Sequence, residues 1–213
     1  MSLPSRLLGA NPSIQVSTLL SGSLSTPSAK DTFLQAIDGY ASIANYTLTD
    51  SNSTEITFSG IISGFNYLQL RIYAKDLASA DNFDGGASIQ FNGDTGANYN
   101  SNYLTTDGAT NSGANSTSRT GGIFYAAVGN TTYPSMYAAT VIDIYDYDKT
   151  NKNKTALAWS GFNGISTGSS PVRNGFFANC WRNTAAITSI TLKPATSSGY
   201  WKTGSQFSLY GIK

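Results

Sequence analysis

Apolar and polar side chains alternate along several short segments of the chain. In residues 67–73, two leucines and an isoleucine fall on one side of an extended strand, and glutamine, arginine and tyrosine fall on the other. Farther along, Ile142 and Ile144 share one side, opposite Asp143, Tyr145 and Tyr147. This period of two residues predicts half-buried β-strands.

Strand and turn signals repeat along most of the chain. Residues 154–161 place Leu157 and Trp159 on a single side, which predicts another strand. Asn-Gly and Asp-Gly pairs between the strand segments are typical of tight turns. Further strands are expected at residues 42–48, 54–58, 88–91, 122–126, 174–181, 187–192 and 205–210. About ten short strands predict an all-β, antiparallel β-sandwich that is jelly-roll-like. Residues 105–122 are rich in Gly, Ser and Thr and predict a long loop, either a free surface loop or one ordered by a neighbour.

The first 39 residues differ from the rest. Three of the six prolines lie there, and no period of 2 or 3.6 is present. We expect two regions: an extended arm over residues 1–39, with one short helix at 28–38, and a β-sandwich domain over residues 40–213. The arm is either a frayed tail or a segment that becomes ordered on a partner. Its apolar side chains favour docking, and the candidate docking residues are Leu3, Leu7, Leu8, Ile14, Leu19 and Leu20.

Composition narrows the possible chemistry. Of the 213 residues, 92 are Ser, Thr, Asn or Gly, which disfavours a helical fold. Histidine is absent and cysteine occurs once, so catalytic triads with histidine and zinc sites with histidine or several cysteines are excluded. We therefore expect neither a metal nor a cofactor.

A net charge of +1 argues against nucleic acid as a partner. No apolar run is long enough to cross a membrane, and no secretory signal is present, so we expect synthesis in a cytoplasm.

Two groups of side chains suggest chemistry on carbohydrates. Asp143, Asp146 and Asp148 could supply the paired carboxylates of a glycosidase, but strand alternation turns Asp146 away from Asp143, so we do not expect an enzyme. Large aromatic residues can stack on sugars. In an all-β domain most of them, including the three tryptophans, are expected in the core. Only Tyr145 and Tyr147, which alternation turns outward, are kept as candidate glycan contacts.

Several sequence blocks follow one another along the chain: residues 58–61 before 67–71, 91–96 with Asn98 and Tyr99, 142–147 before Lys154 and Thr155, Trp181 with 186–192, and 204–212. Taken in order, these blocks resemble a family of small virion structural proteins of tailed bacteriophages, of the type abundant in marine and cyanobacterial phages. The resemblance covers residues 45–212 and does not include the arm. Its more specific parts are the Phe-Asn-Gly-Asp-Thr-Gly turn and the closing strand.

The resemblance implies a β-sandwich module on the exterior of a virion, either a capsid decoration or a head-fibre or tail appendage. We rank first a decoration (cement) protein, which would dock on the major capsid protein or another virion protein, reinforce the shell and form a homo-oligomer, with a trimer favoured. The alternative is an appendage that binds host surface glycans through residues such as Tyr145, Tyr147 and the 105–122 segment. A polysaccharide-degrading enzyme ranks last. The short length and the arm favour the first interpretation, because a host-recognising fibre usually needs a long shaft.

Overall fold

The computed structural model describes residues 39–50, 53–76, 87–125, 135–163, 172–194 and 199–213. The chain divides into two units, Met1–Ala41 and Ser42–Lys213, and the first is described only at its last three residues. The candidate docking residues Leu3, Leu7, Leu8, Ile14, Leu19 and Leu20 and the expected helix at 28–38 lie outside the described residues. The expected division after residue 39 therefore stays a prediction.

The described residues form strands and turns and contain no helix, as the composition predicts. The prediction of an all-β antiparallel fold is confirmed. There are twelve strands: β1 (Tyr40–Thr47), β2 (Ile56–Ser59), β3 (Tyr67–Ala74), β4 (Ala87–Phe91), β5 (Tyr99–Thr106), β6 (Asn111–Arg119), β7 (Gly122–Phe124), β8 (Ala138–Tyr145), β9 (Lys154–Asn163), β10 (Val172–Trp181), β11 (Ser189–Lys193) and β12 (Gln206–Ile212).

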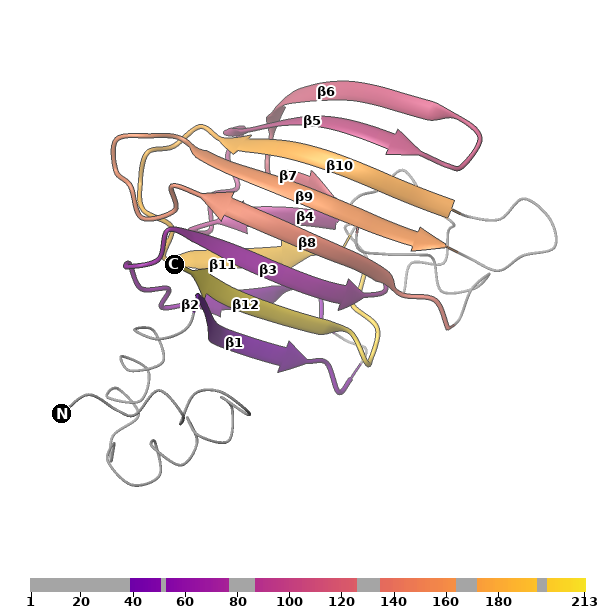
Figure 1. The fold of residues 1–213 in the computed structure, drawn as a ribbon, viewed down its shortest axis with the longest axis horizontal. Helices are drawn as coiled ribbons and strands as arrows, with labels where there is room; N and C mark the ends of the chain where they lie inside the picture. The colour runs from indigo at the N-terminus through magenta and orange to yellow at the C-terminus, as the bar shows by residue number, and fades with distance from the viewer. Residues whose placement is uncertain (1–38, 51–52, 77–86, 126–134, 164–171, 195–198) are drawn as a thin grey trace, which may run out of the picture. The chain divides into compact units, whose positions relative to one another are not determined.

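The strands form two antiparallel sheets that face each other (Figure 1). The eight-stranded sheet has the order β1-β12-β3-β8-β9-β10-β5-β6, and the four-stranded sheet has the order β2-β11-β4-β7. The core between them contains alternate residues of both sheets. Leu70 and Ile142 are buried from the larger sheet, and Ile89 and Ile190 from the smaller one. These facing layers are those of a β-sandwich.

The long loop expected at residues 105–122 is wrong. Half of that segment forms the edge strand β6, which pairs with β5 from Asn111 opposite Thr106 to Arg119 opposite Tyr99. Almost all of β6 is exposed, so the strand has no alternating apolar residues and leaves no hydrophobic signal in the sequence. The turn signal inside the segment is confirmed: the Asp107 carboxylate accepts hydrogen bonds from the backbone N–H groups of Ala109 and Thr110 at 3.0 and 2.7 Å.

The turn between β4 and β5 is attached to the core by one carboxylate. Asn92 and Gly93 adopt the left-handed conformation, with φ of 53° and 67°, as expected for this turn. Asp94 Oδ2 accepts a hydrogen bond from Trp181 Nε1 at 2.7 Å, and Asp94 Oδ1 accepts one from the Gly96 N–H at 2.8 Å. The Trp181 indole is buried, as expected. Its hydrogen bond is the main reason that the pKa of Asp94 lies below its usual value.

We expect acid to destabilise the protein partly through Asp94. A carboxyl group whose pKa is lower in the folded state stabilises the fold above its unfolded pKa of about 4, and this contribution disappears as the pH falls through the folded pKa. Asp94→Asn should therefore lower the free energy of unfolding by about 1 kcal/mol at neutral pH. Urea unfolding at several pH values should show the gap between wild type and variant closing in acid. A gap that stays constant would contradict the prediction.

Candidate functional site

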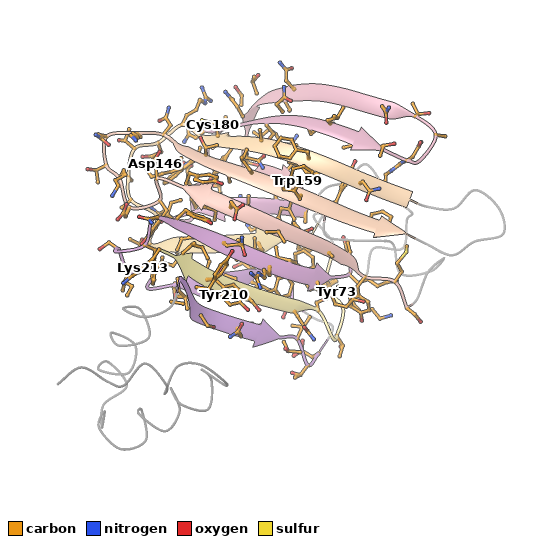
Figure 2. All side chains as sticks on the ribbon, viewed as in Figure 1. Tyr73, Asp146, Trp159, Cys180, Tyr210 and Lys213 are labelled. Atoms are coloured by element: carbon orange, nitrogen blue, oxygen red, sulfur yellow. The ribbon has the colours of Figure 1, made fainter. Side chains whose placement is uncertain are left out.

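The outer face of the eight-stranded sheet presents a row of large side chains. Strand register places Val141 opposite Trp159, Trp159 opposite Phe176, and Phe176 opposite Leu104. Trp159 is 66% exposed and Leu104 is 61% exposed, although both are large and apolar. Figure 2 looks onto this face, with Trp159 near the middle of the sheet. Exposed apolar side chains gathered in one place often mark a binding surface.

Trp159 is the centre of this row, and its orientation is the opposite of the one predicted. The inward positions of β9 are occupied by Ala156 and Ala158, both fully buried, so Leu157 and Trp159 point away from the core. Ala158 lies beside Ile142 and Phe177 of the neighbouring strands, whose larger side chains fill the core around it. Outside, the Trp159 indole lies against the Phe176 ring, with centroids 4.9 Å apart at 59°. This contact orients the indole and leaves most of it exposed to solvent.

A hollow of about 740 Å³ lies on one side of Trp159. Ala139 and Gly161 lie opposite each other on β8 and β9 and form its floor, because neither has a side chain that would fill the space. A Cβ atom at position 161 would lie 2.5 Å from Asn174 Oδ1. Other residues that line the hollow include Leu104, Phe176, Thr106, Asn111 and Asn174. The hollow thus combines apolar walls with amide and hydroxyl groups.

A second hollow of about 390 Å³ lies on the other side of Trp159, over β8, β3 and β12. The Arg71 guanidinium lies over the Tyr210 ring, 4.9 Å from its centroid. Tyr73 is stacked on Tyr137 with centroids 5.1 Å apart. Gln206 and Ser208 of β12 add polar groups to the lining. Figure 2 labels Tyr73 and Tyr210 on this part of the face. Trp159 and Ala139 line both hollows.

Hydrogen bonds or an ion pair link the charged groups near the two hollows. Arg71 Nε donates a hydrogen bond to Gln69 Oε1 at 2.9 Å, and Gln69 Nε2 donates one to Asp143 Oδ1 at 2.9 Å. Gln69 therefore links a cation and a carboxylate on neighbouring strands. Near the first hollow, Arg173 and Asp107 form an ion pair at 3.3 Å. Among the described residues near the hollows, each of these two cations is thus linked to a carboxylate, directly or through Gln69.

The two predicted glycan contacts have different environments. Tyr145 is 38% exposed, lies on the same outer face and is stacked on Tyr67 with centroids 5.3 Å apart. Tyr147 does not face outward, because Asp146, with φ of 54°, breaks the alternation before it. Tyr147 is buried: its hydroxyl donates to the Ile62 carbonyl at 2.9 Å and accepts from the Phe65 N–H at 3.2 Å. Burial raises the pKa of this hydroxyl. Tyr147 therefore cannot stack on an external sugar.

The three candidate carboxylates contact nearby side chains and do not form one site. Asp143 accepts from Gln69, Asp146 pairs with Lys152 at 3.3 Å, and Asp148 pairs with Lys149 at 3.0 Å. In the described part of the chain, no group of three or more Asp, Glu, His or Cys residues is arranged to hold a metal ion.

Lys154 organises the turn before β9. It is fully buried, and its amine donates to the carbonyls of Lys149, Lys152 and Thr184 at 2.7, 2.7 and 3.0 Å. Burial lowers the pKa of the amine, and the carboxylates of Asp146 and Asp148 oppose that shift. Three acceptors require three N–H donors, which only the protonated amine provides.

Comparison with protein-family models, with curated proteins and with solved structures found no significant match. Among the described residues, no helix has the length and apolar character needed to cross a membrane.

Sequence reasoning assigned Trp159 to the core and therefore missed the centre of this face. The sequence does indicate two faces here, because Ala156, Ala158 and Ser160 alternate with Leu157 and Trp159. Alternation indicates two faces but does not say which one is inside when the smaller residues are also compatible with a core.

Proposed function

We propose that this chain is a structural protein of a tailed-bacteriophage virion, with a jelly-roll fold and no catalytic activity. The observation that carries the proposal is the way the strands pair. β1 lies beside β12, β2 pairs with β11, β3 with β8, and β4 with β7. Strands from the two ends of the chain therefore pair successively inward, as in a jelly roll wound from one long hairpin.

The remaining four strands extend this arrangement. When β5, β6, β9 and β10 are set aside, two four-stranded sheets remain, β1-β12-β3-β8 and β2-β11-β4-β7. The set-aside strands are neighbours in the larger sheet and widen it on one side. Jelly rolls are common in viral capsid and lectin domains, which fits the resemblance between the blocks quoted above and phage virion proteins.

The role that we rank first is that of a capsid decoration protein on the virion surface. In this proposal, Leu3, Leu7, Leu8, Ile14, Leu19 and Leu20 dock the arm on the major capsid protein or another virion protein. The sandwich domains associate as a homo-oligomer, with a trimer favoured because shells offer threefold sites. Binding to the assembled lattice stabilises that lattice by mass action. No nucleic acid and no membrane take part, and the protein is made in the host cytoplasm.

Virions that lack this protein are expected to release DNA at a lower temperature than complete virions. DNA release can be followed with an intercalating dye during heating. The control is to add the purified full chain back to the deficient particles, which should restore the release temperature. Equal release temperatures with and without the protein would reject a reinforcing role, and failure to find the chain in purified particles would reject the virion assignment.

The second candidate is a virion appendage that binds host surface glycans. The exposed aromatic face around Trp159, with Tyr145 farther along the same sheet, favours this function. The test is adsorption of the purified protein to host cells. Absence of adsorption at high micromolar concentration would reject it.

A further inference from the structure

We propose that the outer face of the eight-stranded sheet is a binding site for a neutral polysaccharide chain, with Trp159 as a stacking platform between two sugar subsites. This inference deepens the second candidate function and rests on it for its biological role. It moves the glycan contact from Tyr145 and Tyr147 to a site that sequence reasoning did not find.

The first argument is the chemistry of the platform. A pyranose ring has an apolar face of C–H groups and a rim of hydroxyls, so it fits an aromatic ring surrounded by hydrogen-bonding groups. The Trp159 indole is 66% exposed and lies against Phe176. Asn174 and Thr106 line the hollow on one side, and Ser208 lines the hollow on the other. Cavities lined by apolar walls and a few polar groups are typical of small-molecule sites.

The second argument is the width of the apolar row. On one side of this row, the neighbouring residues are Ala139, Gly161, Asn174 and Thr106, which are small or polar. On the other side they are Asp143, Leu157, Ala178 and Asn102, of which only Leu157 is large and apolar, and it is half-buried. The exposed row of large apolar side chains is therefore narrow near Trp159. A stable protein interface buries roughly 800 Å² on each partner around an apolar centre. A narrow row suits a linear chain better than a protein surface.

The third argument is charge. Gln69 joins the Arg71 guanidinium to the Asp143 carboxylate, and Arg173 is paired with Asp107. An acidic polysaccharide would find no uncompensated cation among these groups, and burying a charge without a partner is costly. The paired charges of this face are complementary to a neutral ligand.

The geometry also gives the direction of the chain. From Arg71 through Val141, Trp159 and Phe176 to Leu104, the row crosses five neighbouring strands. At about 4.8 Å between strands, the row is about 19 Å long. Because the two hollows flank Trp159, a bound chain would run across the strands, with one sugar on the indole and others in the hollows.

The test uses the intrinsic fluorescence of the full-length protein. Of the three tryptophans, Trp181 and Trp201 are buried and Trp159 is exposed, so quenching by iodide reports mainly on Trp159. The probes are neutral oligosaccharides of glucose, galactose and mannose, four to six sugars long, with uronic-acid and sulfated oligosaccharides for comparison. We expect at least one neutral series to protect Trp159 from iodide and to bind on a printed glycan array.

Three variants locate the site. Trp159→Ala is expected to weaken binding about tenfold or more, through loss of aromatic stacking and buried apolar area. Ala139→Gln keeps the indole but fills the floor shared by both hollows, and it should weaken binding to a similar extent. Tyr46→Ala removes an exposed aromatic ring that lines neither hollow, and it should leave binding unchanged. Thermal unfolding of all three variants checks that the fold is intact.

Each possible outcome of these measurements either supports or overturns the proposal. Binding of a neutral series that both site variants weaken supports it. Binding confined to acidic glycans, binding that Trp159→Ala leaves unchanged, or no binding at millimolar concentration overturns it. A self-association that Trp159→Ala abolishes, measured by sedimentation, would assign the face to a second copy of the chain and would also overturn it.

Adsorption to host cells separates this inference from the function on which it rests. If wild type and Trp159→Ala adsorb equally, the appendage function is supported and the Trp159 site is rejected. If neither adsorbs but neutral glycans still bind at Trp159, the site is supported and the appendage function is rejected.

Discussion

Replacing Lys154 with methionine is expected to lower the free energy of unfolding by about 3 kcal/mol. Methionine has a similar length and keeps apolar packing, but it provides no donor for the carbonyls of Lys149, Lys152 and Thr184. These three acceptors would be left without the buried amine that now satisfies them, and the carboxylates of Asp146 and Asp148 would lose a nearby cation. Urea unfolding measures the loss.

The matched control is Lys152→Met in the same turn. The Lys152 side chain is largely exposed, and its ion pair with Asp146 at 3.3 Å is worth little in water. We expect that change to cost less than about 0.5 kcal/mol. Similar losses for the two variants would mean that Lys154 does not hold the turn together.

Replacing Asn179 with alanine should also destabilise the protein by about 3 kcal/mol. Asn179 is buried in β10, and its side-chain amide makes two hydrogen bonds to the backbone of Ile123 in β7, which is an edge strand of the smaller sheet. Ile123 N–H donates to Asn179 Oδ1 at 2.8 Å, and Asn179 Nδ2 donates to the Ile123 carbonyl at 3.0 Å. The Asn179 amide thus makes the two hydrogen bonds that the backbone of a further strand would make to Ile123 at this edge of the sheet.

The same side-chain oxygen also accepts a hydrogen bond from Ser101 Oγ at 2.6 Å, so Asn179→Ala would leave three polar groups without this partner. We expect faster hydrogen exchange at Ile123 together with the loss in global stability. Asn102→Ala, at an exposed position of β5, is the control and should change both quantities little. Unchanged exchange at Ile123 would show that β7 does not depend on Asn179.

The sequence predicted the fold class and most strands because the relevant signals are local. Gly and Asn at the turn after β4 accept left-handed backbone conformations, and Leu68, Leu70 and Ile72 alternate with bulkier polar side chains along β3. In such segments, the chemistry of a residue and its neighbours decides the conformation.

The predictions failed where burial depended on distant residues. Edge strand β6 lacks apolar alternation because neither of its faces is buried in this chain. Tyr147 was assigned to the wrong side because the left-handed residue Asp146 breaks the alternation directly before it.

The sequence by itself determined an antiparallel β protein without histidine chemistry. Only the tertiary structure decided which side of β9 is inside, and with it the position of Trp159. The physical reason is that the core is filled by residues from several strands at once. Ala158 can be buried because Ile142 and Phe177 fill the space beside it, and this leaves the larger Trp159 to face the solvent.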